Sequence, residues 1–271
     1  MIHTLFEQVL NDHIPEEECG IFLSGGMDSL SLAFAAHRMN KKITAYTFKF
    51  DNFEPYDYLK AKETCEVFGW DLVTTLIPTD KIEEDFNRLI FEYKCSKKTF
   101  VECMFPFLYV YPNITNKRVI CGVGDPYGTT KKVILNYKEP KSKFDEFRTT
   151  NYKKKTGRAQ HKPLSDQYGI DIIYPLYDDR VFNYFLQFSW DELNKPVQKR
   201  HVREEYADEL SKIGKVKPNI NLQIGSDIDH LFETLLNNHK INFKNRTRMM
   251  DVIRDWCYIR DNQTNTLDLL F

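Results

Sequence analysis

Short β-rich runs alternate with helix-like segments through the first two-thirds of the chain, and this alternation is the feature that most constrains the fold. Near-continuous apolar strands separated by helices predict a parallel sheet that is buried on both faces. We therefore expect an α/β fold with a five-stranded parallel sheet, helices on both faces and a helical C-terminal extension. The expected strands are residues 20–24, 43–50, 71–78, 118–124 and 170–176.

The composition excludes several classes of protein. A formal net charge of −1 excludes a polycation that coats nucleic acid or a membrane. No window approaches the ~20 apolar residues of a membrane span. The six cysteines include no Cys-x-x-Cys pair, so there is no zinc signature and no compact disulfide framework. We expect a soluble, cytoplasmic protein.

Two changes in pattern divide the chain. Residues 131–162 carry nine lysines and two arginines against three acids, and no helical or alternating period survives there. We expect a basic mobile excursion, which is either a solvated loop or a flap that binds a polyanion or closes over phosphates. Residues 1–190 would form the α/β domain, and residues 191–271 a helical region that completes its site.

The sharpest motif is SGGMDS, directly after the first expected strand. A helix that begins there leaves its first N–H groups unpaired, and these groups and the helix dipole favour an anion. Gly25 and Gly26 let the backbone approach that anion and adopt positive φ. Ser24 and Ser29 add hydroxyl donors, and Asp28 suits a divalent cation that bridges phosphate oxygens. The motif therefore predicts a phosphate-binding loop.

This loop resembles the SGGxDS loop of the ATP pyrophosphatase (PP-loop) superfamily, which cradles the pyrophosphate half of ATP. The spacings of a Walker loop and of a dinucleotide fingerprint are both absent. The resemblance implies ATP and Mg²⁺ as cofactors and cleavage of ATP to AMP and pyrophosphate.

Three further stretches resemble the synthetase domain of asparagine synthetase. The first follows the second expected strand, TFKFDNFEPYDYLKAKETCEVFGWDL. In the family the end of this strand, here Thr47 and Phe48, lies against the adenine. An acid such as Asp51 or Asp57 lies near the nucleotide. The alternative for both acids is a solvated loop with a helix N-cap.

The second stretch is VICGVGDPYGTTKK, which stands where the family carries SGEGxDE. The resemblance places Gly122 and Gly124 in a loop near the nucleotide and makes Asp125 a magnesium ligand alongside Asp28. The family's glutamate is implicated in the amide-forming step, and Val123 replaces it here. The sequence thus fits ATP binding but departs from the family at the second half-reaction.

The third stretch, YPLYDDRVFNYFLQFSWDELNKPVQKRHVR, is similar to the family's run of Pro-Phe-Leu-Asp-x-Arg and the helices after it. Asp178 and Arg180 hold the matching positions. Lys199 and Arg203 lie four residues apart and would meet phosphate oxygens from one helix face. The alternative is a helix surface paired with the acids that follow. The predicted catalytic residues are Lys199, Arg203 and Asp178.

The resemblance implies an ATP-dependent ligase that adenylates a carboxylate and then forms a C–N bond. No stretch resembles the glutaminase domain of asparagine synthetase, so we expect free ammonia, an ammonia-supplying partner or a substrate amine. Two alternatives stay open. One is a PP-loop enzyme that modifies a nucleic-acid base, with residues 131–162 binding phosphates. The other is a nucleotide-binding subunit that no longer completes catalysis, which Val123 motivates.

Overall fold

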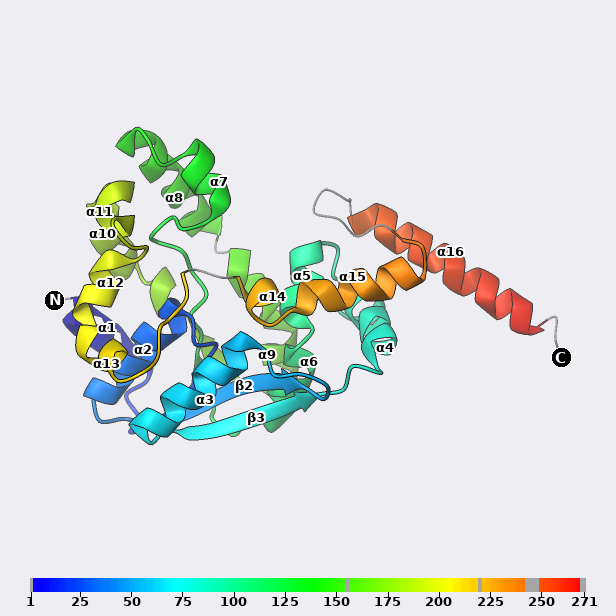
Figure 1. Ribbon diagram of the computed structural model, residues 1–271, viewed down its shortest axis with the longest axis horizontal. Coiled ribbons are helices and arrows are strands. Elements are labelled where there is room, and N and C mark those ends of the chain that lie inside the picture. Colours follow the sequence, from blue (N-terminus) through cyan, green and yellow to red (C-terminus); the bar gives the residue numbers. More distant parts are fainter. Residues whose placement is uncertain (1, 155, 219–220, 242–248, 269–271) are drawn as a thin grey trace.

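The computed structural model describes residues 2–154, 156–218, 221–241 and 249–268. Its centre is a five-stranded sheet in the order β3-β2-β1-β4-β5, and every neighbouring pair is parallel. The predicted α/β fold with a five-stranded parallel sheet is confirmed (Figure 1). The strands are β1 (Glu18–Phe22), β2 (Lys42–Phe50), β3 (Asp71–Ile77), β4 (Arg118–Ile120) and β5 (Asp171–Ile173).

Side chains from each strand alternate between two apolar cores, one on each face of the sheet. On β1, Ile21 belongs to the first core and Phe22 to the second; on β5, Ile173 and Ile172 divide in the same way. This two-sided burial explains why the strands read as nearly continuous apolar runs.

Helices cover both faces, as expected. The elements on the first face are α1 (Ile2–His13), α2 (Met27–Arg38), α3 (Tyr56–Phe68), η4 (Pro175–Tyr177), α10 (Asp179–Leu186), α11 (Trp190–Asn194), α12 (Arg200–Glu205) and α13 (Ala207–Ser211). Those on the second face are α4 (Ile82–Asn87), the π-helix η1 (Arg88–Glu92), α5 (Lys98–Met104), α6 (Phe107–Val110), η2 (Tyr111–Asn113), α9 (Lys162–Tyr168), α14 (Leu222–Gly225), α15 (Ile228–Asn238) and α16 (Met249–Asp268).

The basic segment at residues 131–162 is mostly helical, although no helical period survives in its sequence. Its expected mobility stays a prediction. It forms α7 (Lys131–Asn136), α8 (Lys141–Lys154) and η3 (Thr156–Gln160). The fully buried side chains of α8 are Phe144 and Arg148. The Arg148 guanidinium donates hydrogen bonds to backbone carbonyls, including that of Phe185 at 2.8 Å. A helix that is anchored by a buried polar side chain has no apolar stripe in its sequence. The hydrophobic periodicity therefore does not predict α8.

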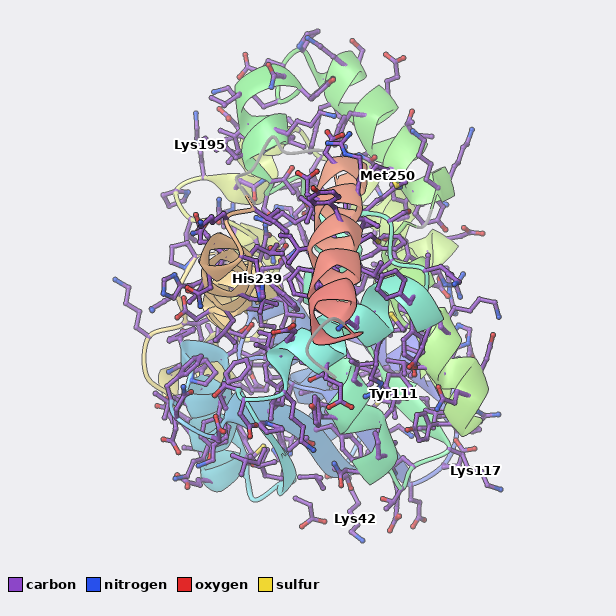
Figure 2. The ribbon with its side chains drawn as sticks, turned by 90° about the vertical axis from the view of Figure 1, so that its right-hand side faces the viewer. Lys42, Tyr111, Lys117, Lys195, His239 and Met250 are labelled. Carbon is purple, nitrogen blue, oxygen red and sulfur yellow. The ribbon has the colours of Figure 1, made fainter. Side chains whose placement is uncertain are left out.

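After residue 190 the described regular elements are all helices, as the sequence predicts. At the end of the molecule far from α1, α16 runs beside α15 (Figures 1 and 2). Trp256 of α16 meets the His239 ring at 4.9 Å between centroids and the Phe86 ring at the same distance. Of the described helices, none combines the length and apolar character needed to cross a bilayer. The division of the chain near residue 190 stays a prediction.

Candidate functional site

A cavity of about 500 Å³ lies at the carboxyl ends of the central strands. In an open parallel sheet, ligands bind outside the carboxyl ends of the strands, where neighbouring connections leave to opposite faces. Here β1 lies between β2 and β4, and residues that follow all three strands line the cavity. Ser24, Gly26, Asp28 and Ser29 form one end of it, so the predicted phosphate-binding loop opens into the cavity.

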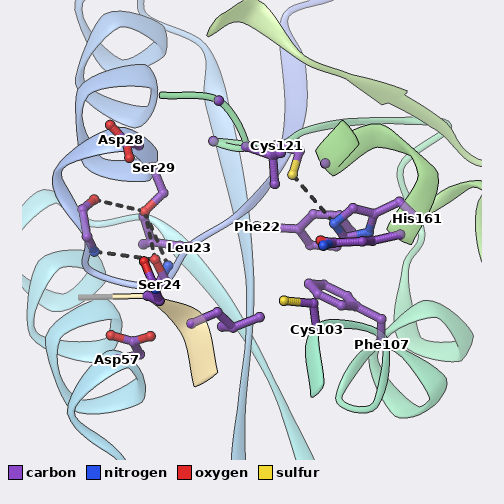
Figure 3. A pocket seen from close by; sticks show the side chains of 18 of the residues that line it. Phe22, Leu23, Ser24, Asp28, Ser29, Asp57, Cys103, Phe107, Cys121 and His161 are labelled. Atoms are coloured by element: carbon purple, nitrogen blue, oxygen red, sulfur yellow. Dashed lines mark hydrogen bonds between the residues drawn. The ribbon is translucent and has the colours of Figure 1, made fainter. Parts of the chain in front are cut away.

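The loop after β1 is organised by its two serine hydroxyls. The Ser29 hydroxyl donates to the Gly26 carbonyl oxygen at 3.0 Å. It also lies 3.3 Å from the Ser24 hydroxyl, and the Gly26 N–H donates to the Ser24 hydroxyl oxygen at 3.4 Å (Figure 3). Among the described residues no side chain caps the start of α2. The first N–H groups of a 12-residue helix therefore face the loop end of the cavity.

Two glycines allow close approach at this loop. Gly25 has φ of +66°, and a Cβ there would lie 2.4 Å from the Lys60 Cγ. A Cβ on Gly122 would lie 2.9 Å from the Ser29 backbone nitrogen. Gly122 thus brings the segment after β4 directly against the first turn of α2, which a larger residue would prevent.

Asp28 and Lys199 form an ion pair at the edge of the cavity. The Lys199 Nζ lies 2.7 Å from the Asp28 Oδ2, and the side chains are 3% and 22% exposed respectively. The Asp28 Oδ1 is buried and accepts no hydrogen bond in the described part of the chain. Burial raises the pKa of Asp28, and the positive charge of Lys199 opposes this rise. The prediction that Asp28 and Lys199 share one site agrees with this placement.

Lys199 is positioned by its backbone rather than by a helix face. It has φ of +59° and precedes α12, which begins at Arg200. The Lys199 N–H donates to the Asn194 Oδ1 at 3.2 Å, and the Asn194 amide donates to the Tyr127 carbonyl oxygen at 2.8 Å. The buried Asn194 therefore ties the lysine to the segment that follows β4.

The Arg203 side chain contacts backbone carbonyl groups, whereas the sequence predicts that it would bind phosphate together with Lys199. Its guanidinium donates to the Gln198 carbonyl oxygen at 3.0 Å and to the Lys217 carbonyl oxygen at 3.3 Å. Its charge still reaches Asp28, whose pKa it helps to lower against the effect of burial. Arg203 thus supports the backbone around the site, and its predicted catalytic role stays a prediction.

Asp125 and Gly124 lie where the second motif places them, in the cavity lining. The Asp125 carboxylate accepts hydrogen bonds from the Thr129 N–H at 2.9 Å and the Thr129 hydroxyl at 3.2 Å. Gly124 has φ of +145°, and a Cβ there would lie 2.7 Å from the Leu176 Cβ. The charge of Asp125 raises the pKa of Asp28, so the two carboxylates lie within electrostatic reach of each other.

The residues at this end fit the Mg²⁺ that the family implies. The Asp28 Oδ1 is an unpartnered oxygen beside a second carboxylate, and Mg²⁺ bound with phosphates typically takes one or two carboxylates. No group of three or more His, Cys, Asp or Glu side chains in the described ranges would hold a metal by itself. Phosphate oxygens would therefore complete the coordination.

The end of β2 supplies the opposite wall. Thr47 and Phe48 line the cavity, as the sequence predicts for an adenine site. Of the two candidate acids, Asp57 lines the cavity, whereas Asp51 accepts hydrogen bonds from Thr79 at the end of β3. Burial raises the pKa of the Asp57 carboxyl to about 7, against an opposing effect of Lys217. Asp57 is therefore the acid that the fold brings to the site.

The other end of the cavity is aromatic and was not predicted from the sequence. It consists of Phe22, Cys103, Phe107, Val110, Cys121 and His161 and is called the aromatic end below. The His161 ring stacks on Phe22 at 5.3 Å and 14°, and it meets Phe107 edge-on at 4.4 Å (Figure 3). Its Nδ1 lies 3.2 Å from the Tyr111 hydroxyl and its Nε2 lies 3.7 Å from the Cys121 Sγ. These residues lie on β1, α5 and α6, directly after β4 and directly before α9, so no spacing in the sequence connects them.

Asp178 is not brought to this cavity. It caps α10 by accepting from the Arg180 N–H at 2.9 Å, and its carboxylate also pairs with the Arg180 guanidinium. It lines a separate pocket of about 400 Å³ with His13 and Arg158. The matching Asp-x-Arg motif thus has a structural explanation in this chain, and the predicted catalytic role of Asp178 stays a prediction.

Val123 lines the cavity at the position of the family's glutamate. A Cβ on Gly157 would lie 2.1 Å from the Val123 Cγ1, so η3 of the basic segment packs directly on it. Gly157, Gln160 and His161 also line the cavity. The basic segment therefore builds one wall of the site, and an apolar contact occupies the place of the glutamate.

Comparison with known families confirms the resemblance seen in the motifs. Residues 2–123 match the family model described as asparagine synthase. This part of the chain, a little under half of it, is similar to the asparagine synthase family. The match spans the strands β1 to β4 and includes the phosphate-binding loop. No curated protein matches the sequence.

Two solved structures are similar to this chain. A predicted subunit of tRNA methyltransferase from Methanocaldococcus jannaschii is 14% identical, with 83% of this chain and 90% of that chain covered and a TM-score of 0.37. NMN synthetase from Francisella tularensis is 16% identical, with 90% and 97% covered and a TM-score of 0.36. At these scores the likenesses say nothing about function.

Proposed function

We propose that this protein is an AMP-forming, ATP-dependent ligase that joins a carboxylate to a nitrogen nucleophile. The observation that carries the proposal is the phosphate-binding loop at residues 24–29, with the Asp28–Lys199 ion pair at its edge. The open N–H groups of α2 suit the two phosphoryl groups of a departing pyrophosphate. A Walker-type kinase would instead need a lysine within the loop itself.

The reaction begins when a carboxylate oxygen of the acceptor attacks the α-phosphorus of ATP. The bond from that phosphorus to the β-phosphate bridge breaks, and pyrophosphate leaves into the loop. Lys199 holds a positive charge beside the departing group, where it stabilises the negative charge that develops. Mg²⁺, when bound at Asp28 and Asp125, neutralises phosphate charge. A nitrogen nucleophile then attacks the adenylated carboxyl carbon and releases AMP.

Val123 bears on the second step. An apolar side chain cannot accept the proton that the attacking nitrogen loses. Asp57 is a candidate for this role in the described cavity lining. Burial raises the pKa of Asp57 to about 7, which is close to the pH at which a general base has to work. We infer that the nitrogen nucleophile attacks as an unprotonated amine and that Asp57 receives the proton that the nitrogen then loses.

The test is the release of AMP and pyrophosphate from Mg-ATP in the presence of a small-molecule fraction or a nucleic-acid fraction of a cell extract. The ligase proposal expects AMP with the small-molecule fraction alone. ADP and phosphate as products would overturn it. ATP binding with no AMP in either fraction would favour a nucleotide-binding subunit that no longer completes catalysis.

A second candidate is a PP-loop enzyme that modifies a nucleic-acid base. It is favoured by the position of the basic segment, whose Gly157 and Gln160 line the cavity while exposed lysines such as Lys153 and Lys154 lie on α8. Cationic side chains beside an active site bind the phosphate backbone of a nucleic acid. AMP formation that requires the nucleic-acid fraction and weakens steeply with added salt would favour this candidate.

A further inference from the structure

The cavity has two ends with different chemistry. The loop end (Ser24, Gly26, Asp28, Ser29 and Asp125) carries hydroxyl, carboxylate and backbone groups, whereas the aromatic end is built from apolar and neutral side chains. Figure 3 shows Asp28 and Asp57 on the side of Ser24, across the cavity from Cys121 and His161. The two ends therefore suit ligand groups of different chemistry.

The aromatic end is uncharged at neutral pH. Burial lowers the pKa of His161 to about 4, so its imidazole is neutral. Burial also raises the pKa of the Cys103 and Cys121 thiols to about 12, so both remain protonated. The described residues that line the cavity include the acids Asp28, Asp57 and Asp125 but no lysine or arginine. A second anionic group of a substrate would find no cation at the aromatic end, and burying it unpaired would be costly.

The three rings at this end are held as one unit. Phe22 and Phe107 meet edge-on at 4.9 Å, and each contacts the His161 ring. Both ring nitrogens of His161 have partners, Tyr111 and Cys121, which fix the orientation of the ring. The unit therefore offers preset aromatic faces and edges rather than hydrogen-bonding groups, and such surfaces favour a flat apolar ligand.

The adenine of ATP has a separate place. The residues predicted to contact it, Thr47 and Phe48, belong to β2, whereas Cys121 follows β4. Because β1 lies between these strands in the sheet, Cys121 and Thr47 lie on opposite sides of the phosphate-binding loop. With adenine on the β2 side, the aromatic end is left for the acceptor.

We propose that the aromatic end binds the acceptor, and that the acceptor is a carboxylic acid whose remaining part is flat, aromatic and uncharged. This inference rests on the proposed ligase function. The acceptor's carboxylate would face the loop end, where ATP and Lys199 are held, while its ring lies against Phe107 and His161. An acid with a second charge, such as aspartate, is disfavoured.

The experiment measures binding without turnover. Protein is saturated with Mg²⁺ and α,β-methylene-ATP, which cannot be cleaved between its α- and β-phosphates. Phenylacetate and L-aspartate are then titrated in by calorimetry. We expect phenylacetate to bind at least about tenfold more tightly than aspartate, because its ring is buried without an unpaired charge. Tighter binding of aspartate would overturn the inference.

A matched pair of variants locates the ring. Phe107→Leu removes an aromatic contact in the cavity, while Phe105→Leu makes the same change two residues earlier at a fully buried side chain that packs on Phe232. We expect Phe107→Leu to weaken phenylacetate about fivefold and Phe105→Leu to leave it unchanged, with the affinity for α,β-methylene-ATP the same in both.

If Phe107→Leu weakened the ATP analogue instead of phenylacetate, adenine would occupy the aromatic end and the inference would be overturned. If the wild-type protein bound neither the ATP analogue nor Mg-pyrophosphate, the proposed function itself would fail. These two failures are distinguishable because the second appears before any acceptor is added.

Discussion

The two ends of the cavity differ in how close their residues lie to one another in the sequence. The loop end comes mainly from one short segment after β1, whose glycines, serines and acid have to stand in order for the backbone to wrap an anion. The aromatic end is assembled from β1, α5 and α6 and from the residues directly after β4 and directly before α9. Chemistry that depends on the backbone is local in sequence, and chemistry that depends on packing is not. In our proposals the loop end binds the phosphates of ATP and the aromatic end binds the acceptor.

The largest effect is expected from Asp28→Asn, which removes a charge from the loop end alone. If Asp28 holds the cation beside the phosphates, AMP formation should fall by about a thousandfold. The rate of AMP release at saturating Mg-ATP checks this. Asp51→Asn is the control, because Asp51 accepts hydrogen bonds from Thr79 outside the cavity; equal losses in both variants would remove the distinction.

Lys199→Met should affect both stability and activity. The substitution leaves a largely buried Asp28 carboxylate without the ammonium 2.7 Å away, which should cost about 2–4 kcal/mol of unfolding free energy. Chemical denaturation measures this loss. The double variant Asp28→Asn/Lys199→Met should recover most of the stability while staying inactive. A double variant as unstable as Lys199→Met would show that the pair is not the cause.

Asp57 gives the cavity a pH dependence. Its pKa is about 7 in the folded protein and close to 4 when unfolded, so the unfolded chain loses this proton first as pH rises. Stability should therefore fall between about pH 4 and pH 7. Asp57→Asn should be more stable than the wild type at pH 8, by about 2–4 kcal/mol, and nearly equal to it at pH 4. Denaturation curves at both pH values provide the comparison, and a constant difference would contradict it.

The smallest effect is expected from Gly25→Ala at the loop end. Gly25 has φ of +66°, and a new Cβ would meet the Lys60 side chain at 2.4 Å, so we expect a loss of about 1–3 kcal/mol and weaker binding of Mg-pyrophosphate. Gly69→Ala is a matched control, since Gly69 has φ of +68° with nothing within 4 Å of the added carbon. Pyrophosphate binding that falls equally in both variants would count against a close-fitting loop.

The strands of the sheet and most of the loop end could be predicted because each is formed by residues that lie close together in the sequence. Apolar runs buried on both faces located all five strands, and the glycines and serines after β1 located the loop. The helices of the basic segment could not be predicted, since α8 is anchored by the buried Arg148 guanidinium on carbonyl oxygens of α10 and the turn after it. The resemblance to the family pointed to Lys199 as a site residue. Its left-handed backbone conformation and its hydrogen bond to Asn194 could not be predicted from the sequence.

The choice between Asp51 and Asp57, and the whole aromatic end, needed the fold. Both acids follow β2 and neither has a distinguishing neighbour in sequence; what separates them is that α14 packs over Asp57 while Thr79 binds Asp51. His161 had no partner within reach along the chain, and its contacts with Phe22, Phe107 and Cys121 arise from tertiary packing.

The central claim is that ATP is cleaved between its α- and β-phosphates and that pyrophosphate occupies the loop after β1. The most direct measurement is the exchange of labelled pyrophosphate into ATP, with Mg²⁺ and the small-molecule fraction of a cell extract present. We predict exchange that depends on that fraction and is lost in Asp28→Asn but kept in Asp51→Asn. Labelled phosphate entering ATP from ADP instead, or exchange that survives Asp28→Asn undiminished, would contradict the account.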